Sequence, residues 1–370
     1  MRLRTRTFLA LTLAGVLDMV LVRVSVAQSG PRLRYDVIGL GVLNGNVPYS
    51  EADGLNDLGQ VVGTSGADDK GTSHSFIWQA GKLVDIGASI EALGPGGTGD
   101  WALRINDFGQ ILGGGNSLPP YVWQSGKLEA LNFNGSCFPG TNNATGINDL
   151  GNVVGTDCEG NGLVWRNGNI TYLPATCSTC LPGSVLPFAI NDVGQIVGEA
   201  IVEGSSLSLH AVLSQDGKVT DLGTLGGDSS VAYAVNVWGQ VVGVSQVDCG
   251  GIPNSCVHAF LWQNGKMQDL GTLTGDDSSQ AVSINALGQV VGVSFSQSGG
   301  RAFLWERGTM SDLNDLIPTN SGWDLVNFTT PGGRVLRGGP TGINNLQQIS
   351  GIGSITGQVN KRAYLLVPRH

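Results

Sequence analysis

The chain has 370 residues and a formal net charge of −9; only 13% of its residues are charged, whereas 41% are hydrophobic and 58 are glycine. A chain this acidic is unsuited to nucleic-acid binding, which depends on clustered Lys and Arg. The hydrophobic content excludes a disordered polymer, and the glycine content is typical of a β-rich fold with many turns.

The N-terminal segment predicts export. Arg2, Arg4 and Arg6 precede an apolar stretch over 8–22, and small residues follow up to Ala27. This is the order of a secretory signal peptide, so we expect cleavage after Ala27 and release into the periplasm or the exterior.

An uncleaved membrane anchor is the alternative interpretation of this segment. Asp18 interrupts an apolar stretch that is already short for a bilayer span, and no other stretch could cross one. We therefore expect residues 1–27 to be a signal peptide and 28–34 a short linker. Cleavage would move the formal charge from −9 to −12, because four Arg and one Asp would leave with the signal peptide.

One phrase recurs seven times along the rest of the chain. It approximates Ile/Val/Leu-Asn-x-x-Gly-Gln-Val/Ile-Val-Gly, and Gln347 replaces the first Gly in the last copy. The spacing between successive copies is 42–59 residues, which is the range of propeller blades. The copies are Leu55–Gly63, Ile105–Gly113, Ile147–Gly155, Ile190–Gly198, Val235–Gly243, Ile284–Gly292 and Ile343–Gly351.

Each copy belongs to a unit of four β-rich runs, of which the fifth is the clearest. Its runs are Val231–Asn236, Gln240–Gln246, His258–Trp262 and Lys266–Leu273, with a strong turn dipeptide at Asn264-Gly265. The third run is apolar at adjacent positions, which predicts a strand buried on both faces. A blade between two neighbouring blades has that environment.

The chain ends predict how the ring closes. The last unit stops at a third run, whereas a match to the missing fourth run stands early, at Asp36–Leu40. We expect Tyr35–Leu40 to be the outermost strand of the last blade. The sequence thus predicts an all-β fold, a seven-bladed β-propeller of four-stranded antiparallel blades over 35–370. A β-solenoid is the alternative, but it would need polar caps instead of exchanged ends.

Six cysteines suggest disulfides in an exported protein. Proximity in the sequence favours the pairs Cys249–Cys256, Cys177–Cys180 and, by remainder, Cys137–Cys158. The Cys177-x-x-Cys180 spacing has a metal or redox alternative, which the absence of a second pair disfavours.

The loops of variable length predict a binding face. In such blades the loop between the second and third strands and the connection to the next blade lie on one face, the loop face; both hairpin turns lie on the other, the hairpin face. All six cysteines and the long insertions fall in loop-face segments. Insertions on one face often mark a binding surface, although loops also vary because variation is tolerated there. The candidate binding residues are Trp101, Phe138, Trp323, Asp228, Asp276 and Asp277.

Several patterns are better explained by structure than by chemistry. The recurring Asn-Asp pairs lack the ligand spacing of a calcium loop, and turn formation accounts for them. The acidic loops around Asp228 and Asp276 also fit polar turns between blades. His74, His210 and His258 occupy a repeat position that holds Arg301 in a later copy. No nucleophile elbow, phosphate loop or zinc-protease motif is present, so we expect no catalytic residue, metal or cofactor.

The units resemble the HAF repeat of extracellular bacterial proteins. The resemblance rests on His258-Ala-Phe-Leu-Trp262, Lys266–Leu273 and Ile284–Gly292, and it extends over most of Tyr35–Val367. The last unit is similar too, at Leu313–Pro318, whereas Val326–Gly342 departs from the pattern as an insertion. The resemblance implies export and a repeat fold, and it carries no established activity or catalytic residues.

The sequence thus favours a secreted, monomeric, non-enzymatic binding module whose partner is an extracellular glycan or protein. The alternative is a carbohydrate-active propeller enzyme, a glycosidase or lyase with carboxylates from several blades. A cluster of carboxylates at the mouth of the channel would distinguish it. A third possibility is an adhesive or stabilising surface component without a small ligand.

Overall fold

The third run of each unit forms a strand buried on both faces, as its adjacent apolar residues predict. In β20 (Cys256–Gln263) the consecutive side chains of Ala259, Phe260 and Leu261 are all buried. Such a strand needs packing partners on either side, and neighbouring sheets in a ring supply them. The structure is a computed structural model that describes residues 34–369 except 45, 47, 68–71, 91–99, 116–117, 134–142, 178–179, 181, 203–207, 249–255, 298, 327–337 and 359.

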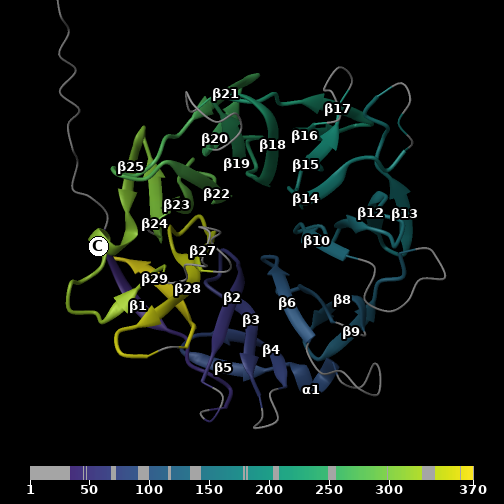
Figure 1. The fold of residues 1–370 in the computed structure, drawn as a ribbon. Coiled ribbons are helices and arrows are strands. Elements are labelled where there is room, and N and C mark those ends of the chain that lie inside the picture. Colours follow the sequence, from purple (N-terminus) through teal and green to yellow (C-terminus); the bar gives the residue numbers. More distant parts are fainter. Residues whose placement is uncertain are drawn as a thin grey trace, which may run out of the picture. The chain divides into compact units, whose positions relative to one another are not determined.

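The described strands form seven antiparallel blades around a central channel (Figure 1). The innermost strands are β2 (Ser50–Leu55), β6 (Asp100–Ile105), β10 (Asn143–Ile147), β14 (Leu186–Ile190), β18 (Gly226–Val235), β22 (Ser278–Ile284) and β27 (Gly339–Ile343). The second strands are β3 (Val61–Gly66), β7 (Ile111–Gly115), β11 (Val153–Thr156), β15 (Ile196–Ile201), β19 (Val241–Val247), β23 (Val290–Ser296) and β28 (Ile349–Ile355).

The outer half of each blade consists of two further strands. Besides β20, the third strands are β4 (Ser73–Gln79), β8 (Leu118–Gln124), β12 (Gly162–Arg166), β16 (Leu209–Gln215), β24 (Gly299–Glu306) and β29 (Arg362–Pro368). The outermost strands are β5 (Lys82–Asp85), β9 (Lys127–Ala130), β13 (Asn169–Tyr172), β17 (Lys218–Asp221), β21 (Lys266–Asp269), β25 (Thr309–Asp312) and β1 (Tyr35–Gly39). Two short helical turns, α1 (Gly87–Ile90) and η2 (Leu313–Leu316), follow β5 and β25.

Each of the seven interfaces between neighbouring blades holds one cluster of buried hydrophobic side chains within the described chain. Between the fifth and sixth blades, for example, Val242 and Leu261 share a cluster with Ala281 and Phe303. Burial of apolar surface between sheets is therefore what holds the ring together. The predicted seven-bladed β-propeller is confirmed.

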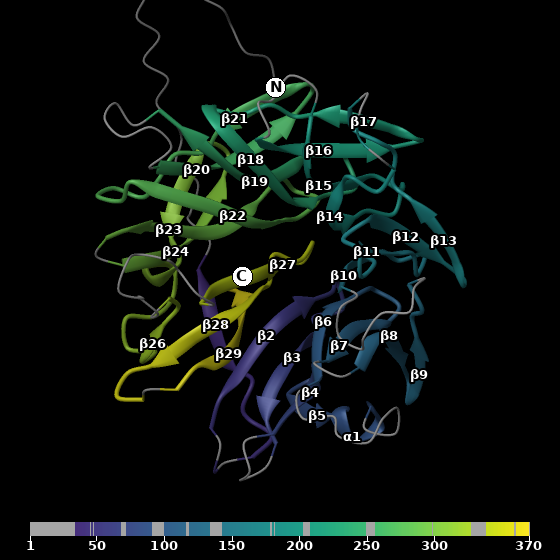
Figure 2. The same cartoon turned by 45° about the vertical axis from the view of Figure 1, so that its right-hand side comes forward.

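The first strand closes the ring, as the chain ends predict. β1 pairs antiparallel with β29, from Tyr35 opposite Pro368 to Gly39 opposite Tyr364. The last blade lies beside β2 of the first blade (Figure 2). One addition was not predicted: the short strand β26 (Trp323–Asp324) also pairs with β28.

The two hairpin turns have the backbone that their residues suggest. Asn264 and Gly265 have φ values of 53° and 76°, both positive, as a two-residue hairpin of type I′ requires. In the Asn-x-x-Gly turn, Gly239 has a φ of 75°. A glycine adopts this region without steric cost, which explains its place in the phrase.

Candidate functional site

Each innermost strand carries a one-residue β-bulge at the same position of the repeat, and the bulge residue faces the channel. The pairing between the first and second strands skips one residue in every blade, as between Ala52 and Gly54 in β2. A bulge leaves one residue outside the ladder and redirects its side chain. The skipped residues, here called the bulge residues, all line a cavity of about 350 Å³. They are Asp53, Leu103, Thr145, Phe188, Tyr233, Val282 and Thr341.

The last glycine of the repeat phrase makes room for the bulge. A Cβ atom on Gly243 would lie 1.9 Å from the carbonyl oxygen of Val231, two residues before the bulge residue Tyr233. A Cβ atom on Gly63 would clash in the same way with the carbonyl oxygen of Glu51, also at 1.9 Å. This position needs glycine because any side chain would clash with the bulged strand. The last glycine of the phrase therefore permits the bulge that places a residue in the channel lining.

An aromatic pair forms one part of the channel wall. The rings of Phe188 and Tyr233 lie 5.7 Å apart between centroids with a tilt of 59°. Both side chains are only half-buried, so they present apolar surface to the cavity. Burial raises the pKa of the Tyr233 hydroxyl, and the nearby Glu199 carboxylate adds to the rise, so this hydroxyl stays protonated.

A single guanidinium group supplies the positive charge of the cavity lining. Arg104 Nη1 donates to the carbonyl oxygens of Asp53 at 3.2 Å and Leu103 at 2.8 Å. The other guanidinium nitrogens have no hydrogen-bond partner among the described residues, and the side chain keeps water-accessible surface in the channel. Desolvation by the surrounding protein lowers the pKa of Arg104, whereas the negative charge of Asp53 raises it. Polar side chains complete the lining, namely Thr145, Gln280 and Thr341.

A closed ring of hydrogen bonds, here called the Asn ring, lies at the hairpin-face end of the channel. The Nδ2 atom of each phrase Asn donates to the backbone oxygen of the phrase Asn in the next blade, at 2.9–3.0 Å. All seven bonds run in the same rotational sense. In order, the ring is Asn56, Asn106, Asn148, Asn191, Asn236, Asn285, Asn344 and Asn56 again.

In four blades the Asn side chain uses its full hydrogen-bonding capacity, as Asn236 shows. Asn236 Oδ1 accepts the N–H groups of Trp238 and Gln240, both at 3.0 Å. Its Nδ2 atom donates to Gln240 Oε1 at 2.7 Å and to the oxygen of Asn285 at 3.0 Å. A carboxamide has two acceptor and two donor sites, and all four are filled. The expected turn role of Asn is therefore incomplete, because one of the four bonds joins this blade to the next. The recurring Gln, which a turn alone does not require, was the available signal.

Four carboxylates follow the Asn ring in adjoining blades and form an acidic half-ring. The N–H of Asp57 donates to Asp107 Oδ1, that of Asp107 to Asp149 Oδ1, and that of Asp149 to Asp192 Oδ1, each at 2.8 Å. The remaining three blades place uncharged residues here, namely Val237, Ala286 and Asn345. Asn345 keeps the same geometry, because its Oδ1 accepts the N–H of Ala286 at 2.7 Å.

Burial and mutual repulsion make two of these carboxylates harder to ionise. Burial raises the pKa of Asp107, and the carboxylates of Asp57, Asp149 and Asp192 add to the rise, against the hydrogen bond from the Asp57 N–H. The pKa of Asp149 is raised by the same causes, with burial first. The hairpin-face mouth is therefore a site of concentrated negative potential.

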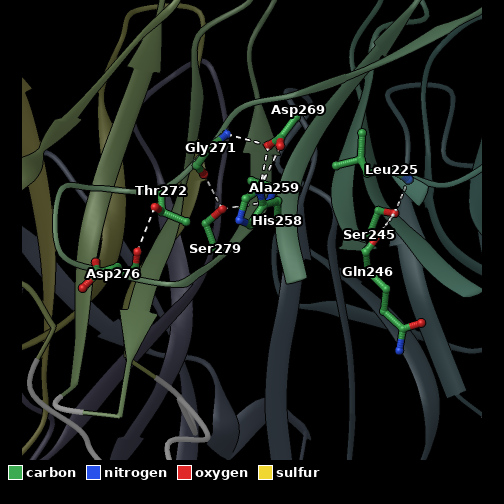
Figure 3. Close-up of polar contacts among 10 residues, drawn as sticks. All are labelled: Leu225, Ser245, Gln246, His258, Ala259, Asp269, Gly271, Thr272, Asp276 and Ser279. Atoms are coloured by element: carbon green, nitrogen blue, oxygen red, sulfur yellow. Dashed lines mark hydrogen bonds and ion pairs between the residues drawn. The ribbon is translucent and has the colours of Figure 1, made fainter. Parts of the chain in front are cut away.

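The acidic loops named from the sequence hold the connections between blades. The Asp276 carboxylate accepts from Ser294 Oγ at 2.7 Å and pairs with Arg301 at 2.9 Å, and its side chain is only 7% exposed. Its carbonyl oxygen accepts from Thr272 Oγ1 (Figure 3). Asp228 and Asp277 are exposed and remain candidates for binding, whereas Asp276 is held in a buried ion pair.

A buried serine in the same loop joins two blades, and the sequence did not single it out. Ser279 Oγ donates to the carbonyl of Gly271 at 2.6 Å and accepts the N–H of Ala259 at 2.8 Å (Figure 3). Ser230 makes the equivalent bonds one blade earlier. These contacts support the interpretation of the Gly-Asp-Ser-Ser loops as inter-blade turns.

The repeat histidines bridge the two outer strands of a blade. His258 Nδ1 lies 2.8 Å from the Asp269 carboxylate, and two other blades repeat the pair (Figure 3). The hydrogen bond to Asp269 raises the pKa of His258 against the effect of burial. In the second blade Pro119 takes the place of the His and Ala130 that of the Asp. In the third blade Asn161 and Tyr172 take these two places. The repeated pairs are His74–Asp85, His210–Asp221 and His258–Asp269.

The aromatic loop candidates are less accessible than expected. A binding role predicts exposed side chains for the three aromatic candidates, but Trp101 and Trp323 are both half-buried. Trp323 packs edge-on against Tyr364, with ring centroids 5.9 Å apart, and joins the cluster between the sixth and seventh blades. Phe138 lies outside the described residues, and a binding role for the three remains a prediction.

The cysteines follow the expected pattern as far as the described chain extends. Cys177 and Cys180 form a disulfide. Cys158 and Cys256 are each disulfide-bonded as well, whereas Cys137 and Cys249 lie outside the described residues. No described cysteine is free.

The described part of the chain contains no group of three or more His, Cys, Asp and Glu residues suited to holding a metal ion. None of its helices has the length and apolar character that a membrane crossing requires.

Comparison with known proteins identifies only distant structural likenesses. No known family profile and no curated protein matches the chain. A puromycin-hydrolyzing peptidase of Mycobacterium tuberculosis is 12% identical, with a TM-score of 0.47 over 87% of this chain and 49% of that chain. This chain thus spans about half its length.

Two other likenesses involve proteolytic enzymes. The β-propeller domain of the Trilobed protease from Pyrococcus furiosus is 10% identical, with a TM-score of 0.47 over 86% of this chain and 93% of that chain. A prolyl endopeptidase is 10% identical, with a TM-score of 0.49 over 87% and 51% of the two chains. Similarity at this level says nothing about the activity of this chain.

Proposed function

We propose that the protein is a secreted, non-enzymatic binding module that holds a small acidic sugar in its central channel. One observation carries the proposal. The seven bulge residues occupy equivalent positions, yet they include acidic, aliphatic, hydroxyl and aromatic side chains. The repeat phrase that follows each of them varies little. The repeats thus keep the same backbone and vary the side chains that a ligand in the channel would contact.

The chemistry of the lining favours a sugar with a carboxylate. Sugar rings stack on aromatic side chains such as Phe188 and Tyr233, while Thr145, Gln280 and Asp53 offer hydrogen-bonding partners for hydroxyl groups. Arg104 would bind the carboxylate, because a guanidinium recognises that group through two parallel hydrogen bonds. The cavity of about 350 Å³ has the size of a small-ligand pocket.

The route of entry and the compartment are parts of the same proposal. The cavity lies on the loop-face side of the Asn ring, since the bulge residues precede the phrase Asn along each innermost strand. The ligand would therefore enter from the loop face. Export and membership of the HAF-repeat family remain proposals that rest on the sequence.

Calorimetric titration with neutral and uronic mono- and disaccharides tests this function. We expect uronic sugars to bind more tightly than neutral ones, Arg104→Gln to remove that preference, and Phe188→Leu to weaken both classes. Arg166→Gln, at an exposed arginine of β12, is the matched control and should bind normally. Equal binding by the Arg104→Gln variant, or no sugar binding at all, would refute the proposal.

The carbohydrate-active alternative keeps one supporting observation. The acidic half-ring supplies carboxylates from four blades at a channel mouth, and the pKa values of Asp107 and Asp149 are raised, as a general acid requires. One observation argues against an enzyme: a carboxylate oxygen already accepts a backbone N–H in each of Asp107, Asp149 and Asp192. Hydrolysis of a polysaccharide panel that Asp107→Asn abolishes would favour the enzyme.

A further inference from the structure

The hairpin face presents seven exposed apolar side chains, here called the apolar crown. Each is the third residue of an Asn-x-x-Gly turn or of its Gln347 variant, and their exposed fractions run from 56% to 72%. They are the seven most exposed large hydrophobic side chains of the described chain. The crown consists of Leu58, Phe108, Leu150, Val193, Trp238, Leu287 and Leu346. Apolar exposure that is concentrated in this way marks an interaction surface.

The contacts that hold the turn give no reason for an apolar residue at these positions. The turn is held by Asn236 and Gly239, and the Trp238 ring beyond it is 72% exposed, with Nε1 donating to the carbonyl of Ala286 at 2.9 Å. A polar side chain would fit an exposed turn equally well. The copies vary among Leu, Phe, Val and Trp, yet none is polar. What the positions share is therefore apolar character, which the turn itself does not explain.

The acidic half-ring lies between the crown and the channel, and it specifies the charge of a partner. The mouth that these residues line has no Lys, Arg or His among its described lining residues. A basic side chain that entered it would meet the carboxylates of Asp57, Asp107 and Asp149 without competition from a local cation. The surface thus combines an apolar rim with an acidic centre.

We propose that the apolar crown docks a protein segment that carries a Lys or Arg flanked by apolar side chains. The basic group enters the acidic mouth, and the flanking side chains pack on the crown. A second copy of this chain would bring a second acidic mouth to the contact, and an anionic lipid surface would bring phosphate groups. Charge therefore favours the basic segment over both.

Two sets of substitutions separate the apolar and the electrostatic contributions. Leu58→Ser, Phe108→Ser and Leu150→Ser together remove three of the four crown side chains beside the acidic half-ring. Asp107→Asn, Asp149→Asn and Asp192→Asn remove charge but keep the oxygen that accepts a backbone N–H, as Asn345 does naturally. Val84→Ser, at a 48% exposed side chain of the outer strand β5, is the control for loss of surface apolarity.

Selection from a random peptide library on the full chain, with counter-selection on the crown variant, tests the proposal. We expect enriched peptides to carry Lys or Arg beside apolar residues. Fluorescence anisotropy of the best peptide should show affinity losses of about tenfold or more for both variant sets, and none for Val84→Ser. The Asp variants should also lose the salt dependence of binding.

Several outcomes would overturn the proposal. Enrichment of acidic or uncharged peptides would do so, as would equal binding by the crown variant or failure to enrich any peptide over the counter-selection. Crown-dependent binding to anionic vesicles would instead identify a membrane surface. Crown-dependent dimerisation in sedimentation would identify a second copy.

Discussion

Asn344 and Asn56 are 288 residues apart, yet Asn344 Nδ2 donates to the carbonyl oxygen of Asn56 at 3.0 Å. This bond completes the Asn ring between the last blade and the first. Every blade is thus joined to the next by one such bond, including the two blades that contain the chain ends.

The Asn ring predicts that Asn236→Asp destabilises the fold. A carboxylate cannot donate, so it would face Gln240 Oε1 and the Asn285 carbonyl with no hydrogen to share. We expect a loss of about 1–3 kcal/mol in the free energy of unfolding, the usual effect of leaving buried polar groups unsatisfied. Urea denaturation measures it. Asn264→Asp is the control, because Asp216 already occupies the matching turn position; equal losses in the two variants would contradict the role of the ring.

The bulge predicts that Gly243→Ala is more harmful than Gly265→Ala. The methyl group added at position 243 would meet the Val231 carbonyl at 1.9 Å, whereas nothing lies within 4 Å of the Gly265 position and only its φ of 76° opposes a side chain. The second change should cost about 1–2 kcal/mol, and the first should cost more because backbone must move. Thermal melting of both variants compares them, and the reverse order would show that the bulge can shift freely.

The pairing of β1 with β29 predicts that the first strand is essential. A chain that begins at Gly41 would leave the edge of β29 unpaired and would remove Tyr35 from the cluster between the sixth and seventh blades. We expect lower melting and weaker cooperativity than for a chain that begins at Gln28. Circular dichroism provides the measurement, and identical melting curves would refute the closure argument.

The His258–Asp269 pair predicts a pH-dependent contribution to stability. The folded-state pKa of His258 is raised above 6.5, so its contribution is fully present below about pH 6.5 and is lost as pH rises through the folded-state value. Burial alone would raise the pKa of Asp269, but hydrogen bonds from His258 and Gly271 hold it below 3.8. Its contribution is lost only in stronger acid. The melting difference between the wild type and His258→Gln should therefore shrink above pH 6.5; a constant difference would exclude the ion pair as its cause.

The packing of Trp323 predicts a loss of stability on truncation. Trp323→Ala would remove the edge-on contact with Tyr364 and open space beside Gly39, whose ideal Cβ position is 3.0 Å from the Trp323 ring. We expect about 2–4 kcal/mol of destabilisation, below that of a fully buried Trp because the side chain is half-buried. Differential scanning calorimetry tests this, and an unchanged melting temperature would favour the binding role predicted from the sequence.

The sequence predicted the blades and their closure because those features are local or repeated. Turn residues, adjacent apolar positions and the matching ends are visible without neighbours. The Asn ring was missed, because the acceptor of each Nδ2 bond in the ring lies in another blade, as that of Asn236 does. The bulge residues were missed because they are the variable position: nothing in a strand sequence marks Asp53 or Phe188 as the skipped residue. The apolar crown could have been found, because its third turn residue is apolar in every copy.

The closing strand also sets an order of events for the growing chain. β1 is the first described strand to be synthesised, but its partner β29 is the last. Until β29 is available, β1 has no partner and the outer half of the seventh blade cannot form. Contacts of such long sequence separation form slowly, so ring closure is expected to limit the folding rate. An open ring with unpaired strand edges is prone to aggregation, and the chain is exposed to this risk until β29 is available to pair with β1.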